Sequence, residues 1–386
     1  MFDQEARLER MLARHGDAAV VEPLAGRPTV VRRDQILVAA DDAAVVEDRI
    51  RRWYDSSQDE GGVCLMRLRP RARVDVCELA SRLGGDGRHR KLAVAPNHLM
   101  YGQPMWWSGP ADRPRPCDPV PAPSAAVPPR RDVTVAVLDT GMSPHPWYEH
   151  ADWYAEQRAE VAEVLDADLD FELDAQAGHG TFIAGVVLRH APSARIRARR
   201  VIGGDGVGDE LDVVRALQWV AAWGRADVVN LSLGCHTFDD RPSPVLARVI
   251  ASLGRGTVVV AAAGNAAGDR PFWPAALKPV IAVAALDGED RAWFSNYGWW
   301  VDACAPGVDV ASCYLDLSRE RPPMRGLEAG AFTGYATWSG TSFAAPAVAG
   351  MIAGLAAAED LDAVAAADRV LDPVKARTLP DLGVVV

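Results

Sequence analysis

The sequence has few cysteines, and none of them is spaced as a metal or disulfide motif. Six occur in 386 residues without a C-x-x-C pair, so neither a zinc knuckle nor a disulfide framework is indicated: Cys64, Cys77, Cys117, Cys235, Cys304 and Cys313. The first five residues, MFDQE, contain no basic residue, and no apolar stretch follows them as in a secretory signal. These absences predict a cytoplasmic protein with mostly reduced thiols, with export by another route as the alternative.

Long apolar runs and excess positive charge are also missing. No run approaches the roughly 18–20 apolar residues of a membrane span, so no membrane partner is expected. The formal net charge of −11 argues against nucleic acid as a partner, because phosphate binding needs a basic face. The arginines between residues 195 and 200 are interpreted as one solvated strand edge.

Three short stretches each place a chemically capable residue beside glycine or a small neighbour. They are VAVLDTG at 135–141, GHGTFIAG at 178–185 and GTSFAAPAVAG at 340–350, and they supply Asp139, His179 and Ser342. An imidazole takes the proton of the serine hydroxyl, and a carboxylate fixes the tautomer of that imidazole. The sequence therefore predicts a nucleophilic serine.

The order of the three residues narrows the fold. They run Asp, His, Ser along the chain, whereas α/β-hydrolases run Ser, acid, His. Ser342 also lacks the G-x-S-x-G elbow of that fold, because Ala344 stands where its second glycine should be. An esterase of the α/β-hydrolase fold is disfavoured.

Together these stretches resemble the subtilisin-like serine proteases over roughly residues 133–358. A fourth matching segment, AAAGNAAG at 261–268, lies between the second and third. The resemblance implies a subtilisin-like three-layer αβα fold with a mostly parallel sheet. It also implies that the amide of Asn265 and the backbone N–H of Ser342 stabilise the oxyanion of the acyl-transfer intermediate.

The same resemblance implies two segments that pair with an extended peptide substrate and wall its specificity pocket. They are Ser232, Leu233 and Gly234, and Ala262, Ala263 and Gly264. Cys235 follows where the family commonly has a second glycine, so it either makes the enzyme thiol-sensitive or is buried and inert.

The periodicity from Val133 onward supports this fold independently. Apolar strands alternate with helices, which predicts a parallel sheet covered on both faces. The ends of three of these strands carry Asp139, the 232–234 segment and the 263–265 segment. We expect these to gather at one edge of the sheet. The expected elements are strands 134–138, 196–202, 228–233, 257–263 and 280–286, and helices 181–188, 211–223 and 245–253.

Proline divides the chain. Nine of the 27 prolines lie within residues 104–129, a density that forbids helix and strand ladder alike. We therefore expect residues 1–101 to form a small domain, 102–132 a linker and 133–386 the peptidase domain. The small domain is expected to hold strands 35–39, 63–68 and 91–95, helices 41–54 and 75–83, a fourth strand within 71–76 and a short helix within 3–15.

The small domain resembles the α+β ferredoxin-like propeptide of subtilisins, which serves as chaperone and inhibitor. Its exit, PNHLMYG at 96–102, resembles the propeptide tail that lies in the active site. The resemblance implies that this domain is an intramolecular inhibitor, with Tyr101 as the residue before the processing cut.

Acidic residues are concentrated in one stretch. Residues 149–174 hold ten acids and one arginine, a local charge of −9. The stretch is interpreted either as an ordinary solvated surface or as a field that attracts cationic substrate residues. Asp166, Asp168 and Asp170 suggest calcium, but Phe171 and Ala177 break the EF-hand pattern. Structural calcium is therefore not indicated, and binding through another geometry is left open as an alternative.

The leading hypothesis is a serine endopeptidase made as a self-inhibited zymogen. Its chemistry requires no cofactor, and no metal ligand is among the predicted site residues. One alternative is a regulatory or binding protein whose cleft stays occluded. The other is an exopeptidase of the same fold.

Overall fold

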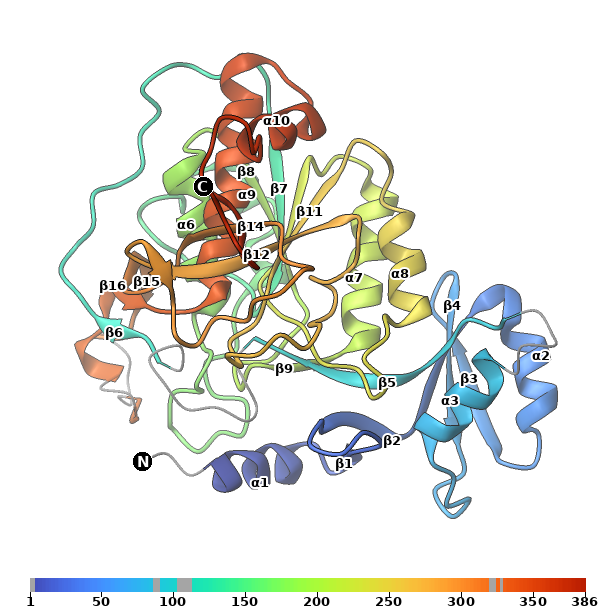
Figure 1. The fold of residues 1–386 in the computed structure, drawn as a ribbon. Coiled ribbons are helices and arrows are strands. Elements are labelled where there is room, and N and C mark those ends of the chain that lie inside the picture. Colours follow the sequence, from blue (N-terminus) through green and yellow to red (C-terminus); the bar gives the residue numbers. More distant parts are fainter. Residues whose placement is uncertain (1–3, 86–90, 103–112, 319–323, 327–328) are drawn as a thin grey trace.

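The structure is a computed structural model that describes all residues except 1–3, 86–90, 103–112, 319–323 and 327–328, and no side chain of residues 4–7 (Figure 1). It contains a large unit built on a mostly parallel sheet and a smaller N-terminal unit with its own sheet. The two units share one strand pairing, described below.

The large sheet lies at the centre of the large unit. Its main path has the order β17-β18-β14-β12-β11-β10-β7-β8, and β13 pairs with β12. Neighbours from β18 to β8 run parallel, whereas the β17–β18 and β12–β13 pairs are antiparallel. The strands are β7 (Thr134–Asp139), β8 (Arg195–Arg200), β10 (Val228–Leu231), β11 (Val258–Ala262), β12 (Val280–Asp287), β13 (Asp290–Arg291), β14 (Ala303–Pro306), β17 (Thr378–Leu379) and β18 (Gly383–Val385).

Helices cover both faces of this sheet. Side chains alternate along each strand, so Val135 and Val137 of β7 enter one hydrophobic cluster while Ala136 and Leu138 enter another. Figure 1 shows α6 and α9 on one side of the sheet and α7 and α8 on the other. The predicted three-layer αβα fold is confirmed. The helices are α6 (His179–His190), α7 (Glu210–Trp223), α8 (Pro244–Ala251), α9 (Thr341–Glu359) and α10 (Ala363–Val370).

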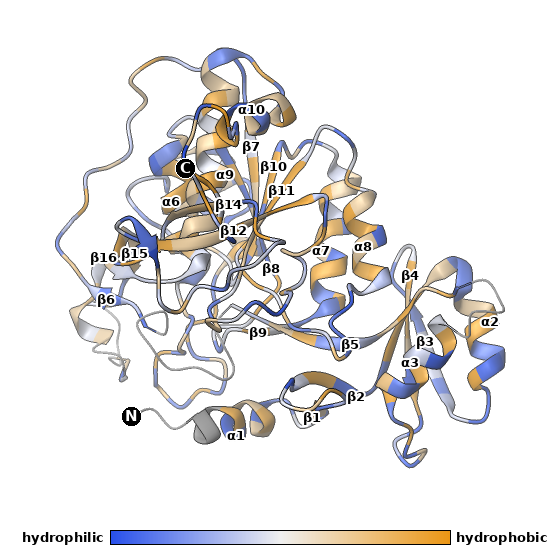
Figure 2. Ribbon diagram, in the orientation of Figure 1, coloured by the Kyte–Doolittle hydropathy of each residue, from blue (hydrophilic) through white to orange (hydrophobic). Residues whose placement is uncertain are grey.

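The helix α9 passes through the core of the large unit. It is the one helix among the described residues that is long and apolar enough to cross a membrane by composition, so the expectation that no segment approaches this length was wrong. However, 78% of its apolar window is buried within the protein. Figure 2 shows the neighbouring strands β10 and β11 in the hydrophobic colour. The apolar character of α9 is explained by burial between other elements.

The N-terminal unit packs two helices against an antiparallel sheet. The sheet has the order β3-β4-β2-β5, β1 pairs with β2, and β5 continues the sheet by pairing with β9 of the large unit. The elements are β1 (Ala18–Val21), β2 (Thr29–Ala39), α2 (Ala40–Ile50), β3 (Tyr54–Asp59), β4 (Val63–Leu68), α3 (Val76–Gly84), β5 (Val94–Tyr101) and β9 (Val207–Asp209).

Two predictions for this unit had the wrong bounds. The fourth strand is β3, at 54–59 rather than within 71–76, and the helix predicted to reach Tyr54 ends at Ile50 because Tyr54 begins this strand. Because β3 is a polar, mostly exposed edge strand, it has no hydrophobic alternation to reveal it. The strand predicted at 91–95 is β5, which runs on to Tyr101 and so reaches the large unit.

The remaining elements lie around the large unit. The helix expected within 3–15 is present as α1, and a small sheet has the order β15-β16-β6. The prediction that proline-rich residues form no ladder was wrong at β6, whose two residues pair with β16. These elements are α1 (Gln4–Arg14), β6 (Arg115–Pro116), α4 (Asp152–Ala155), α5 (Arg158–Val161), β15 (Val310–Asp316), η2 (Ala329–Ala331) and β16 (Thr333–Trp338).

Candidate active site

Asp139 and His179 are held together at the carboxyl end of β7. Asp139 is the last residue of that strand and is completely buried. Its Oδ1 lies 2.7 Å from His179 Nδ1 and accepts a hydrogen bond from the Thr140 N–H at 2.8 Å. If Nδ1 carries the proton, Nε2 is left as the acceptor that a general base needs.

Glycines allow His179 to begin α6 in a crowded place. Gly178 has φ 80°, and a Cβ added there would lie 2.4 Å from a ring carbon of Tyr314. A Cβ on Gly180 would lie 2.2 Å from the Gly141 carbonyl oxygen. A side chain at either position would push the first turn of α6, and His179 with it, away from β7.

A carboxylate that the sequence did not single out caps this helix. Glu163 accepts hydrogen bonds from the N–H groups of Gly178 and Thr181 and from the hydroxyls of Thr140 and Thr181. Thr181, the third residue of α6, does not cap the helix itself, because its hydroxyl donates to Glu163. The cap comes from fifteen residues upstream of Gly178, so no local capping pattern could reveal it.

Ser342 is the second residue of α9 and is 3% exposed. Its Oγ lies 3.3 Å from two carbonyl oxygens, those of Gly102 and Ser232. Within the described part of the chain, the Ser342 hydroxyl makes these two contacts and no hydrogen bond to His179 Nε2. The ring centroids of His179 and Phe343 are 5.4 Å apart, so the imidazole lies beside the start of α9.

Gly102 lies between the imidazole and the hydroxyl. A Cβ added to Gly102 would be 3.6 Å from His179 Cε1, and its carbonyl oxygen is the one that Ser342 contacts. Asp139, His179 and Ser342 thus converge at one place, with a segment of the chain itself inserted beside them.

Asn265 is oriented by the residue that precedes Ser342. Its Oδ1 accepts hydrogen bonds from the Thr341 N–H at 2.8 Å and from the Thr341 hydroxyl at 2.9 Å. With the oxygen occupied, the amide orientation follows from the network, and Nδ2 has no hydrogen-bond acceptor among the described residues. This arrangement suits a donor to an oxyanion beside Ser342.

The two predicted wall segments lie next to this site. The Ser232 hydroxyl donates to the Ser342 carbonyl oxygen at 2.9 Å, and Gly264 N–H donates to the Thr341 hydroxyl at 3.0 Å. Ala262 and Ala263 are buried at the end of β11, and Leu233 is buried beside Gly234. Both segments therefore border the start of α9, as expected of strand ends at one sheet edge.

The end of strand β5 lies between β9 and the 232–234 segment and is hydrogen-bonded to both. Tyr101 N–H donates to the Gly234 oxygen at 2.9 Å, Gly234 N–H donates to the Tyr101 oxygen at 3.1 Å, and Gly102 N–H donates to the Gly206 oxygen at 3.1 Å. The Tyr101 carbonyl is thus paired with Gly234, and the next carbonyl, that of Gly102, faces Ser342.

Cys235 is 1% exposed, and its backbone pairs with Trp273. Burial raises the pKa of the thiol well above its ordinary value, which disfavours the reactive thiolate. Of the two interpretations, the buried and inert cysteine is the one that agrees with the structure. All six cysteines lie in described segments, and none forms a disulfide.

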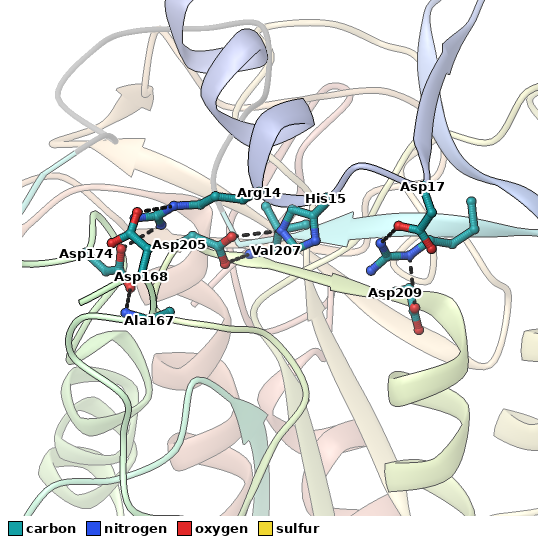
Figure 3. A network of polar contacts seen from close by, with 10 residues as sticks. Arg14, His15, Asp17, Ala167, Asp168, Asp174, Asp205, Val207 and Asp209 are labelled. Carbon is teal, nitrogen blue, oxygen red and sulfur yellow. Dashed lines mark hydrogen bonds and ion pairs between the residues drawn. The ribbon is translucent and has the colours of Figure 1, made fainter. Parts of the chain in front are cut away.

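The N-terminal segment holds the acidic stretch by ion pairs, which Figure 3 shows from close by. Arg14 bridges Asp168 and Asp174, with its Nη1 2.7 Å from Asp174 Oδ1. His15 Nε2 lies 2.8 Å from Asp205 Oδ2. Part of the stretch read as a solvated surface is therefore an intramolecular interface.

The three aspartates that suggested calcium lie close together. Ligand oxygens of Asp166, Asp168 and Asp170 are within 4.8 Å of one another. Asp166 accepts hydrogen bonds from the N–H groups of Asp170 and Phe171, and Asp168 accepts from Arg14. Because these oxygens are engaged by protein donors, we assign no ion to them.

Comparison with known proteins points to one family. The model of the subtilase family (Peptidase_S8) matches residues 130–376. Thermophilic serine proteinase of Bacillus sp. (strain AK1) is 38% identical over 234 residues, which are 58% of this chain and 51% of that protein. Subtilisin BL of Lederbergia lenta is 36% identical over 232 residues, which are 57% of this chain and 75% of that protein. The chain thus spans about half the length of the first relative.

The predicted cytoplasmic location is wrong by this comparison. Minor extracellular protease Epr of Bacillus subtilis (strain 168) is 32% identical over 235 residues, and its name places it outside the cell. The prediction depended on the composition of five residues and on cysteine spacing, and neither property excludes export.

Proposed function

The chain belongs to the subtilase family, and from this premise we propose that it is a serine endopeptidase made as a self-inhibited zymogen. In this proposal His179 removes the proton of Ser342, and the serine oxygen attacks a peptide carbonyl. Asp139 holds the imidazole, and Asn265 with the Ser342 N–H stabilises the oxyanion. His179 then gives its proton to the leaving amine as the peptide C–N bond breaks, which leaves the acyl-enzyme. The same imidazole takes a proton from water, which attacks the acyl carbonyl, and returns that proton to Ser342 as the ester bond breaks.

One observation carries the proposal: β5 lies as an extended strand where a substrate would lie. It is hydrogen-bonded on one side to β9 and on the other to Gly234, and it leads to the Gly102 carbonyl, 3.3 Å from Ser342 Oγ. Main-chain pairing of this kind supplies the register of an extended peptide. The wall segments at 232–234 and 262–264 are proposed to bind substrate in the same way.

The pairing also bears on the processing site. The Tyr101 carbonyl is held by Gly234 N–H, so its attack by Ser342 would require that hydrogen bond to break. We therefore propose that the cut follows Gly102 or a residue shortly downstream, among residues 103–112 that the structure does not describe, rather than Tyr101.

Residues 1–101 are proposed to act as the intramolecular inhibitor. Docking involves more than β5, because Arg14, His15 and Arg32 of the N-terminal segment pair with Asp174, Asp205 and Asp209 of the large unit. A peptide substrate can enter only where β5 has left, so release of the N-terminal unit would switch the enzyme on.

Intact masses of the purified wild type and the Ser342→Ala variant test this proposal. The wild type should separate into two fragments with a cut beyond Tyr101, and Ser342→Ala should stay whole. Equal, uncut masses together with no cleavage of added peptides would favour the alternative, a protein whose cleft stays occluded. Release of products only from peptide ends would favour an exopeptidase.

A further inference from the structure

His98 and Glu210 form a buried pair where β5 crosses the large unit. His98 Nδ1 lies 2.9 Å from Glu210 Oε2, and each side chain is 1% exposed. The other carboxylate oxygen accepts a hydrogen bond from the Ser243 hydroxyl. Glu210 therefore has one partner from its own unit and one partner that belongs to the strand in the groove.

The strand register explains why these two residues meet. β5 pairs with β9 through Leu99 and Asp209, Met100 and Gly208, and Tyr101 and Val207. One further step in this register puts His98 opposite Glu210, and residues directly opposite in an antiparallel pair project to the same face. Any peptide that pairs with β9 in this register would present one side chain to Glu210.

The surroundings of His98 suit a planar cation. The Phe238 ring stacks on the imidazole, with the centroids 6.1 Å apart and 14° between the ring planes. His98 Nε2 is buried and has no hydrogen-bond partner within the described part of the chain. A carboxylate at the edge of a flat ligand and an aromatic face above it are the features that recognise guanidinium or imidazolium groups.

We propose that Glu210, with Ser243 and Phe238, forms a subsite that selects a cationic side chain in peptide substrates. The selected substrate residue takes the place of His98. It lies three residues before the substrate residue that pairs with Gly234, as His98 lies three residues before Tyr101. The proposal rests on the proposed function, because it assigns a preference to the same cleft.

The preference follows from the partners that the Glu210 carboxylate would keep or lose with each kind of side chain. A neutral residue without an N–H or O–H donor would leave the buried Glu210 carboxylate with the Ser243 hydroxyl alone. Glutamine could donate to the carboxylate, but it brings no positive charge to offset the cost of burying it. An acidic residue would bring two carboxylates together. An arginine or protonated histidine would restore the contact that His98 makes, and arginine stays charged at every working pH.

Peptides that differ only at this position test the proposal. Cleavage by the full chain is measured for members that carry arginine, histidine, glutamine or glutamate there. We expect kcat/KM for the arginine peptide to exceed that for glutamine by about tenfold, with glutamate the poorest substrate. Glu210→Gln should reduce the ratio to below about threefold, since its amide carries no charge to match.

Asp212→Asn is the matched control. It removes one negative charge from the same helix, but Asp212 faces Arg215 rather than β5. This variant should keep the preference for arginine. An active wild type that cleaves all peptides equally, or an arginine preference that survives Glu210→Gln, would overturn the proposal.

A second measurement separates this proposal from the proposed function, because it needs no cleavage. In the Ser342→Ala background, urea unfolding is compared for His98→Arg, His98→Gln and His98→Glu, each with and without Glu210→Gln. His98→Glu should lower the unfolding midpoint most, and Glu210→Gln should recover much of that loss. Equal midpoints for His98→Arg and His98→Glu would overturn charge selection at Glu210, even in a chain that cleaves nothing.

Discussion

Glu163 Oε1 accepts hydrogen bonds from both the backbone N–H and the hydroxyl of Thr181, at 3.1 and 2.5 Å. Its Oε2 accepts from the Thr140 hydroxyl at 3.2 Å and from the Gly178 N–H. One buried carboxylate thus ties the residue after Asp139 to the first turn of α6, which carries His179. Burial raises the pKa of Glu163, and the hydrogen bonds oppose that shift.

Glu163→Gln should loosen the geometry between Asp139 and His179. An amide nitrogen cannot accept a hydrogen bond, so at least one N–H or hydroxyl of the α6 turn would lose its partner. We expect a loss of about 1–3 kcal/mol of unfolding free energy and a lower kcat with little change in KM. Urea unfolding and peptide kinetics check this, with the exposed Glu160→Gln as control. A kcat equal to that of the control would contradict a positioning role.

Asn265→Ala should remove the amide donor proposed for the oxyanion. Loss of one such donor from a subtilisin costs about 10²–10³ in kcat, and we carry that magnitude over to this chain. Since Thr341 would also lose an acceptor, folding is checked by circular dichroism. A fall in kcat of less than about threefold in a folded variant would show that Asn265 does not serve the intermediate.

Arg14→Gln should weaken docking of the N-terminal unit. Asp174 is buried beside Arg14, and without the guanidinium its carboxylate would keep the Ala167 N–H as its hydrogen-bond donor. Burial raises the pKa of Asp174, because the ionised carboxylate is unfavourable away from water. We expect faster onset of peptidase activity after dilution from urea. Arg10→Gln, an exposed change on the same helix, should behave as wild type; identical onset in both variants would contradict the prediction.

Acid should destabilise the protein through two buried histidines. Burial lowers the pKa of His145 and of His236 to about 4, against about 6.5 in the unfolded chain. The folded state therefore disfavours the protonated form, so this stability is complete above about pH 6.5 and is lost as the pH falls toward 4. Each histidine should contribute on the order of 3 kcal/mol over that range.

His236→Gln checks this dependence. Urea unfolding between pH 4 and 8 should show a shallower loss of stability for this variant than for the wild type. His150→Gln, which changes a residue whose side chain is 90% exposed, should keep the wild-type slope. Parallel slopes for wild type and His236→Gln would show that His236 is not the group that titrates.

The sequence revealed the parts of the fold whose pattern is local. Strand β4 was predicted with its observed ends, and the helix predicted at 211–223 differs from α7 by one residue. Buried strands such as β11 carry continuous apolar runs, and catalytic residue types beside glycine can be read without a structure. The gathering of Asp139 and the 232–234 and 263–265 segments follows from parallel strands that end at one edge of the sheet.

What the sequence could not reveal depends on pairing between distant segments. Glu163 is one of ten acids in its stretch, and only the fold shows that it caps α6 rather than facing solvent. The polar strand β3 carries no hydrophobic alternation. His98 and Glu210 are 112 positions apart, and the register of β5 on β9 is what joins them.

Digestion of a diverse peptide pool by the full chain, with the fragments sequenced by mass spectrometry, tests whether Ser342 and His179 cleave internal peptide bonds. We expect internal cleavages by the wild type, and their loss by about 10⁴-fold or more in both Ser342→Ala and His179→Ala. Cleavage by these variants at the wild-type rate, or no cleavage by the wild type after its N-terminal unit has been released, would contradict it.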